Sequence, residues 1–173
     1  VGEEDHVKPA VEALGRLEYF VVIDFFMSES ARYADVVLPG SLMEEDEGTT
    51  TNVEGRVIPH RQVVHPPEGA RQDWRIICDL AQRLGAGDKF AYQSTAEIFE
   101  ELRIASKGGI ADYAGITWER IDREMGVFWP CPSLEHPGTP RLYEGHHFGH
   151  ADGKAHFQPV EWRPAVEEPD ADY

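Results

Sequence analysis

Cysteine is scarce in this sequence of 173 residues, which contains only Cys78 and Cys131. Two thiols cannot build a disulfide framework or a four-thiolate metal site. Cys78 falls on an expected helix one turn from Trp74, and Cys131 stands between two prolines with no evident base beside it. A nucleophilic thiol needs a neighbouring histidine or a helix N-terminus to activate it. We therefore interpret both cysteines as structural.

Positive charge and long apolar runs are also in short supply. The chain carries 32 acidic residues against 16 Lys and Arg, which gives a formal net charge of −16. Such a surface repels phosphate backbones and anionic lipid, so no nucleic-acid partner is expected. No apolar run is long enough to cross a bilayer, and we expect no membrane insertion. A hydrophobic content of 41% still suffices for a packed core.

The two ends of the sequence suggest a segment of something longer. The first residue is Val1 rather than Met, and Tyr173 closes an acidic stretch. We expect the remainder of the same polypeptide to be the partner of this chain, and a segment of this kind should not fold alone. The true N-terminus is then missing, so the absence of a signal peptide does not indicate a compartment.

The first half of the chain alternates helix and strand signals, which is typical of an α/β fold. Helical spacing predicts a helix over 5–14, and a continuous apolar run predicts a strand over 18–26 that is covered on both faces. A second strand is expected over 34–39, and Ser28 could cap a short helix between the two strands. The polar stretch 43–56 is expected to be a surface loop or a loosely paired hairpin, followed by an extended segment over 57–64. An amphipathic helix is predicted over 73–84, with an apolar stripe made by Trp74, Ile77, Leu80, Ala81 and Leu84.

The second half of the chain predicts helices followed by a proline-rich extended segment. A capping box over 94–97 opens a helix that ends near 105, and a further helix is expected over 117–125. Residues 129–145 are rich in proline and predict an extended strap laid over another surface, with no partner inside this chain. The Asp152-Gly153 pair indicates a turn with a returning strand over 154–157. Residues 161–173 are acidic and predict a solvated connector.

Two groups of residues could carry chemistry. His146, His147, His150 and His156 with Asp152 offer zinc ligands on paper, but the glycines around them argue against a helix that would align them, and we reject a metal site. Asp24 ends the apolar run 18–26, where open α/β sheets bind ligands, and its carboxylate could accept two hydrogen bonds from a guanine edge. A strand-end Asp that caps the turn near Ser28 is an equal alternative. The chain has no Gly-rich phosphate-binding loop.

Four motifs in order, ADVVLP (34–39), the acidic run that reaches Glu47-Gly48, TNVEGRV (51–57) and ARQDWRIICDLAQRLG (70–85), resemble one family. It is the molybdopterin oxidoreductases that bind bis-molybdopterin guanine dinucleotide, such as nitrate reductases and formate dehydrogenases. The stretches WPCPSLEHPGTPRLY (129–143) and DGKAHFQPVEWRP (152–164) are similar to the branch that holds cytoplasmic nitrate reductases and formate dehydrogenase large subunits. The resemblance runs from about Leu17 to Tyr173 and implies an internal segment.

The resemblance implies a division of the chain. Residues 1–90 would belong to a parallel-sheet α/β domain that binds the molybdopterin dinucleotide. Residues 91–160 would be a helical and extended Pro-rich segment, and residues 161–173 would lead to a missing cofactor-binding domain. The iron–sulfur cluster and the molybdenum ligand would lie in missing parts, so no catalytic residue is assigned here.

Four cofactor contacts carry over from the resemblance. Ile23 and Asp24 match the family's contacts to one guanosine, and Asp73 matches another dinucleotide-contacting position. Asp46 stands where many relatives have Lys, so a cationic contact would be lost there.

The implied reaction is a two-electron step at molybdenum, in which nitrate loses an oxygen or formate is oxidised. We favour a cytoplasmic nitrate reductase of nitrate assimilation with an electron-transfer partner. A formate dehydrogenase large subunit is the first alternative, and a non-catalytic α/β binding module is the second.

Overall fold

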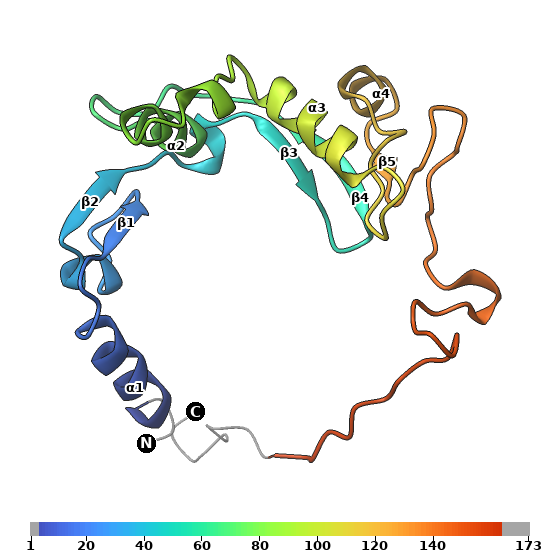
Figure 1. Cartoon of the computed structure of the whole chain (residues 1–173), viewed down its shortest axis with the longest axis horizontal. Coiled ribbons are helices and arrows are strands. Elements are labelled where there is room, and N and C mark those ends of the chain that lie inside the picture. The colour runs from blue at the N-terminus through green and yellow to red at the C-terminus, as the bar shows by residue number, and fades with distance from the viewer. Residues whose placement is uncertain (1–3, 164–173) are drawn as a thin grey trace, which may run out of the picture. The chain divides into compact units, whose positions relative to one another are not determined.

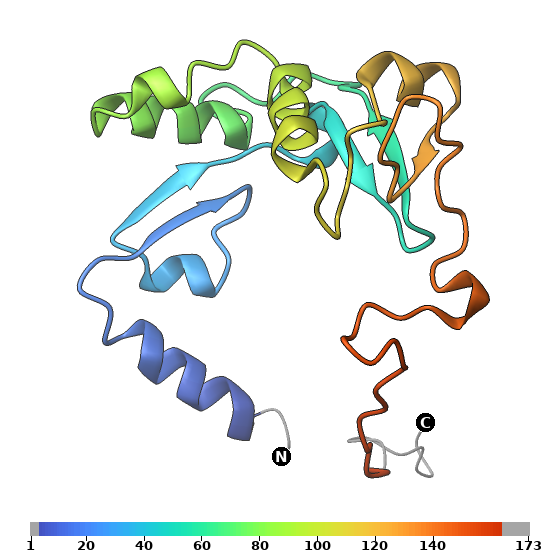
Figure 2. The ribbon, with the colours of Figure 1, turned by 45° about the vertical axis from the view of Figure 1, so that its right-hand side comes forward.

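The structure is a computed structural model that describes residues 4–163 (Figures 1 and 2). Two units make up the chain, one formed by residues 19–140 and a smaller one formed by residues 1–18 and 141–173. Most of the predicted acidic connector, 164–173, lies outside the described residues.

The smaller unit holds α1 (Glu4–Leu14), drawn in dark blue in Figure 1. The helix is confirmed at the predicted position, and the N–H of Gly15 donates to the carbonyl of Val11 at 3.1 Å where it ends. Residues 141–163 contain one short 3-10 turn, η4 (Glu144–His146), and a turn at 151–154. The strand predicted over 154–157 is wrong, because this exposed segment finds no strand to pair with among the described residues.

The larger unit begins with two parallel strands, β1 (Val21–Asp24) and β2 (Val36–Pro39), which pair from Val21 with Val36 to Asp24 with Pro39. The 3-10 turn η1 (Ser30–Tyr33) connects them. This parallel pair with its helices confirms the predicted α/β class. The strand is shorter than the predicted 18–26, and within this chain it is not covered on both faces, since Val21 is 40% exposed.

A three-stranded antiparallel sheet follows the turn η2 (Met43–Glu45). Its strands are β3 (Gly48–Thr51), β4 (Arg56–His60) and β5 (Val127–Phe128), in the order β3-β4-β5. The hairpin alternative for the polar stretch is therefore confirmed. Asn52 forms its turn, because its side-chain oxygen accepts hydrogen bonds from the N–H groups of Glu54 and Arg56, both at 3.0 Å.

The helices of the larger unit begin close to their predicted positions. They are α2 (Asp73–Arg83), α3 (Thr95–Ser106) and α4 (Trp118–Arg123), with a short turn η3 (Gly87–Lys89) after α2. Ser94 caps α3 by accepting the N–H of Glu97 at 3.3 Å, which confirms this half of the predicted capping box, while the Glu97 side chain accepts the N–H of Gln93 at 2.8 Å instead of that of Ser94. The apolar stripe predicted for α2 is partly wrong. Ile76 and Ala81 are buried, whereas Ile77, Leu80 and Leu84 are exposed.

The core of the larger unit gathers residues from the hairpin, two helices and the strap: Val57, Phe99, Ile116, Ile121, Val127 and Cys131. Figures 1 and 2 show α3 lying across β3 and β4, with α4 and β5 beside them. Cys131 is fully buried, which agrees with its predicted structural role. The expectation that the strap has no partner in this chain is wrong for its first part, which packs into this core. The domain boundary placed at residue 90 stays a prediction.

Candidate functional site

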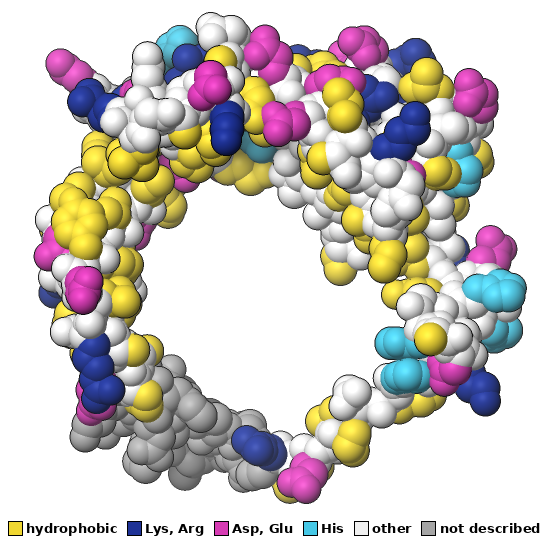
Figure 3. Space-filling view, viewed as in Figure 1, with side chains coloured by type: hydrophobic (Ala, Val, Ile, Leu, Met, Phe, Trp, Pro, Cys, Tyr) yellow, Lys and Arg dark blue, Asp and Glu magenta, His cyan; other side chains and the backbone are white. Residues whose placement is uncertain are grey.

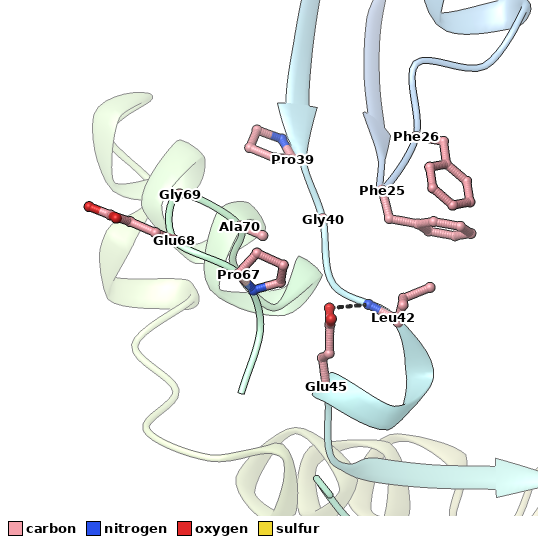
Figure 4. A pocket seen from close by; sticks show the side chains of 10 residues that line it. All are labelled: Phe25, Phe26, Pro39, Gly40, Leu42, Glu45, Pro67, Glu68, Gly69 and Ala70. Atoms are coloured by element: carbon pink, nitrogen blue, oxygen red, sulfur yellow. Dashed lines mark hydrogen bonds between the residues drawn. The ribbon is translucent and has the colours of Figure 1, made fainter. Parts of the chain in front are cut away.

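A pocket of about 370 Å³ lies at the carboxyl ends of β1 and β2 (Figure 4). Three segments line it: the residues after β1, the end of β2 with the turn that follows, and the loop before α2. The lining residues are Phe25, Phe26, Pro39, Gly40, Leu42, Glu45, Pro67, Glu68, Gly69 and Ala70. In open α/β sheets this end of the strands is where ligands bind.

Gly40 sets the geometry of the pocket floor. Its N–H donates to the carbonyl of Asp24 at 3.2 Å, which ties the turn after β2 to the end of β1. A Cβ at this position would lie 2.5 Å from Oδ1 of Asp73 and 3.0 Å from Cγ2 of Ile23. A larger residue at this position would force the Asp73 carboxylate to move. The N–H of Arg71 donates to the carbonyl of Pro39 at 3.1 Å and fixes the loop before α2 against β2.

The walls of the pocket are mostly apolar. Phe25 and Phe26 are 52% and 71% exposed, and their ring centroids lie 4.9 Å apart. Pro67 faces them from the loop before α2 (Figure 4). Glu45 supplies a nearly buried carboxylate below the turn, at 8% exposure. None of the ten lining residues is Lys or Arg.

Asp24 is half-buried beside this pocket but does not line it. Its Oδ2 accepts the hydroxyl of Ser28 at 2.7 Å, and its Oδ1 accepts the N–H of Phe26 at 3.3 Å. These two hydrogen bonds, the Ser28 hydroxyl first, hold the pKa of Asp24 below its usual value. Ser28 in turn accepts the N–H of Ala31 at 3.3 Å, so the predicted capping arrangement is present. A ligand-binding role for Asp24 stays a prediction.

The other three residues predicted to contact the cofactor, Ile23, Asp73 and Asp46, lie in two places. Ile23 and Asp73 both approach Gly40 and so lie with Asp24 around one point of the pocket floor. Asp46 lies apart, with its Oδ1 accepting the N–H of Glu47 at 2.7 Å and its Oδ2 near the Ser41 hydroxyl at 3.5 Å. It does not line the pocket.

Sequence reasoning missed the residues that do line the pocket. Phe25 and Phe26 were read as the end of a strand, although two adjacent aromatics at a strand end are a signal for a ligand wall. Glu45 stands three residues after Leu42, and this spacing is the sequence signal of a side chain that folds back onto the start of its own turn. Its neighbour Asp46 was chosen instead.

The histidine-rich segment shows a different arrangement from a metal centre. Nε2 of His156 lies 3.1 Å from both carboxylate oxygens of Asp152, and the ring of His156 stacks on that of His150 with centroids 3.8 Å apart. Within residues 4–163, no three metal-binding side chains are grouped to hold an ion. No helix of the described chain has the length and apolarity that a membrane span requires.

Comparisons with known proteins place this geometry in a family. The family model of the molybdopterin oxidoreductases matches residues 3–83, which include β1, β2 and all of α2. The assimilatory nitrate reductase catalytic subunit of Bacillus subtilis is 54% identical over 164 residues, which are 94% of this chain and 23% of that protein. The F420-dependent formate dehydrogenase subunit alpha of Methanocaldococcus jannaschii is 42% identical over 167 residues, or 96% of this chain and 24% of that protein.

A solved structure shares the fold. Acetylene hydratase from Pelobacter acetylenicus superimposes with a TM-score of 0.50 and 27% identity, over 67% of this chain and 15% of that one. The chain spans about a quarter of the length of the curated relatives it matches. The matched residues include both parallel strands and the three segments that line the pocket, and they show that this chain belongs to the molybdopterin oxidoreductase family.

Proposed function

We propose that this chain is a cofactor-holding part of a nitrate reductase, which converts nitrate to nitrite with two electrons. The observation that carries the proposal is the 54% identity to an assimilatory nitrate reductase catalytic subunit over 94% of the chain. The family to which the chain belongs uses a molybdenum–pterin cofactor. When bound, that cofactor supplies the redox chemistry, and we assign no catalytic residue to this chain.

The pocket at the strand ends fits the nucleoside part of a molybdopterin guanine dinucleotide. Its volume of about 370 Å³ falls in the range of about 300–1,000 Å³ that is usual for small-molecule sites. Phe25 and Phe26 offer apolar faces for a planar base, and Gly40 keeps the floor free of a side chain. Because the lining contains acids and no Lys or Arg, we place the base or ribose in the pocket and the phosphates outside it.

Asp24 is proposed as an acceptor for the guanine edge. An ionised carboxylate has about four lone-pair positions, and the Ser28 hydroxyl and the Phe26 N–H occupy two of them. Two positions remain for the N1–H and the amino group of guanine. Ile23 and Asp73, which meet Asp24 around Gly40, would shape the same contact, and Asp46 remains a weaker proposal because its oxygens already have local partners.

The rest of the proposal concerns the longer protein. We propose a second dinucleotide on the same molybdenum, an iron–sulfur cluster held by another part of the polypeptide, an electron-transfer partner and a cytoplasmic location. The second candidate function is formate oxidation, which the 42% identity to a formate dehydrogenase subunit over 96% of the chain favours. Membership of an oxidoreductase family argues against a non-catalytic binding module.

The test uses the full-length polypeptide that contains this chain. Purified protein should release two guanine nucleotides for each molybdenum after acid hydrolysis, and it should reduce nitrate with a reduced dye as electron donor. Oxidation of formate with no reduction of nitrate would replace the first candidate by the second. Protein that carries molybdenum without a guanine nucleotide would contradict the assignment of the pocket.

A further inference from the structure

Glu45 is a nearly buried carboxylate with incomplete hydrogen bonding. It is 8% exposed, and its Oε2 accepts the N–H of Leu42 at 2.9 Å, the dashed line in Figure 4. In the described part of the chain, Oε1 has no hydrogen-bond partner and no Lys, Arg or His forms an ion pair with this side chain. Among the described residues, the N–H of Leu42 is therefore the one hydrogen-bond donor to this carboxylate.

Oε1 of Glu45 keeps some contact with solvent, because it is not among the fully buried side-chain atoms that lack a hydrogen-bond partner. A ligand that fills the pocket would displace this water, and the charge would then need a hydrogen-bond donor from the ligand. The side chain lines the pocket, and Figure 4 shows its carboxylate next to the backbone of Leu42 and below Gly40. A group that enters the pocket can reach the unused oxygen, and a hydrogen-bond donor on that group would complete the carboxylate.

We propose that Glu45 is a ligand-binding residue of this pocket, which accepts a hydrogen bond from an N–H or O–H group of the bound nucleoside. The inference rests on the proposed function, because the nucleoside is that of the dinucleotide cofactor. The cofactor contact predicted for Asp46 is thereby assigned to the adjacent Glu45. Asp46 has a backbone N–H on one oxygen and lies outside the pocket, whereas Glu45 lines it.

A purely structural role for Glu45 makes different predictions. The side chain closes the turn η2, since it binds the N–H of Leu42 while its own N–H donates to the carbonyl of Leu42 at 3.0 Å. A glutamine oxygen could accept the same N–H, so Glu45→Gln leaves the turn closed. The substitution removes the charge and replaces the unused acceptor by an amide that donates as well.

The experiment compares Glu45→Gln with the matched control Glu44→Gln in the full-length enzyme, because Glu44 is exposed on the same turn and does not line the pocket. Each variant is prepared with its cofactor and, separately, in cells that cannot make the cofactor. We expect Glu45→Gln to lose guanine nucleotide at least about tenfold faster during dialysis, because a hydrogen bond to a charged group contributes about 1.5–3 kcal/mol. The unfolding temperature of its cofactor-free form should stay equal or rise, since a buried charge is gone. Glu44→Gln should retain nucleotide as the parent does.

Three soluble probes identify the donor. Binding of GMP, 2′-deoxy-GMP and IMP to the cofactor-free proteins is measured by calorimetry. If the ribose 2′-hydroxyl is the donor, the parent and Glu45→Gln should bind 2′-deoxy-GMP with equal affinity. If the guanine amino group is the donor, the two proteins should bind IMP with equal affinity.

Two results would overturn the inference. One is a Glu45→Gln enzyme that retains nucleotide as well as the parent. The other is nucleotide loss accompanied by a lower unfolding temperature of the cofactor-free form, which would assign Glu45 a structural role. A parent enzyme that holds no guanine nucleotide is a separate outcome, because it contradicts the proposed function itself.

Discussion

At the scale of single residues, Asp112 is a buried carboxylate whose two oxygens both accept hydrogen bonds. Its two carboxylate oxygens accept the N–H groups of Gly108 at 2.7 Å and of Ala114 at 2.8 Å, and its carbonyl accepts the N–H of Cys131 at 2.8 Å. The backbone hydrogen bonds, that from Ala114 first, hold the pKa of Asp112 below its ordinary value of 3.8. The residue thereby fixes the loop between α3 and α4.

The lowered pKa of Asp112 predicts a dependence of stability on acid. A carboxylate with a depressed native pKa stabilises the fold above its ordinary pKa, and this contribution is lost as the pH falls from about 4 through the native pKa. We expect Asp112→Asn to be less stable than the parent at pH 7, with a difference that narrows as the pH falls below 4. Urea unfolding at pH 7, 5 and 3 measures this difference. A constant difference would contradict the prediction.

Gly115 allows the closest approach between two segments of the larger unit. A Cβ at this position would lie 1.9 Å from the carbonyl oxygen of Ser133 and 2.8 Å from Sγ of Cys131. Backbone atoms cannot move aside as a side chain can, so Gly115→Ala should cost about 3 kcal/mol or more of unfolding free energy. The matched control is Gly149→Ala, where no atom lies within 4 Å of the new Cβ. Equal stability of the two variants would show that the contact is not made.

The sequence could predict where the candidate site lies but not which acid enters it. The apolar run that ends at Asp24 and the α/β rule together placed a site at the strand ends, and a pocket is found there. Glu44, Glu45, Asp46 and Glu47 are consecutive acids, and only Glu45 is buried. The backbone direction of one 3-10 turn decides which of them points inward. Neither the composition of the sequence nor the spacing of its residues predicts the direction in which this turn runs.

At the scale of elements, Arg120 holds the first part of the strap against α4. Arg120 is 7% exposed, and its Nη1 donates to the carbonyls of Gly115 at 3.0 Å and of Leu134 at 3.3 Å. The same nitrogen lies 3.3 Å from Sγ of Cys131, while Nε binds Glu124. Arg120 therefore adds a donor for the Leu134 carbonyl of the strap to backbone hydrogen bonds such as that from the N–H of Gly115 to the carbonyl of Cys131 at 2.7 Å.

Removal of this guanidinium should release the strap. We expect Arg120→Met to lower the unfolding free energy by about 3 kcal/mol, because buried carbonyls and Glu124 lose their donor. Arg123→Met is the control on the same helix, since Arg123 also binds Glu124 but its side chain is 69% exposed. Its effect should stay below about 1 kcal/mol. Trp129 packs against the core, so tryptophan fluorescence during urea unfolding reports both variants. Similar losses in the two variants would place the effect in the ion pair rather than in the strap.

The elements themselves were more predictable than their surroundings. Caps and glycines mark the ends of α1, α2 and α3, so local chemistry suffices to place them. The buried face of α2 was not predictable in the same way, because Ile76 and Ile77 are adjacent and either could face the core. The strap was misjudged because a proline-rich sequence says nothing about a buried arginine that approaches it from another element.

At the scale of the whole molecule, much apolar surface is left uncovered. Large hydrophobic side chains are exposed on several elements, including Phe26 at 71%, Leu84 at 82% and Ile104 at 69%. Figure 3 shows hydrophobic side chains at the surface over β1 and β2. Patches of this kind mark contacts with other protein surfaces.

This exposed surface predicts how the chain of 173 residues behaves by itself. We expect it to self-associate at micromolar concentrations, despite its net charge of −16. Light scattering coupled to size-exclusion chromatography measures the association. A Phe25→Ser, Phe26→Ser double variant should associate less without a lower unfolding midpoint, since both rings are exposed. A monodisperse parent chain would show that the exposed side chains do not drive association.

The core cluster has a consequence for the order of folding. Its six residues run from Val57 to Cys131, and β4 pairs with β5 with Val57 opposite Val127. Closing so long a loop carries an entropy cost, and contacts between residues far apart in the chain slow folding. The buried Arg120 also donates to the carbonyl of Leu134 at 3.3 Å, so the core uses residues beyond Cys131. During synthesis, the core can therefore close only after residue 134 has left the ribosome, later than the hairpin and α3 are made.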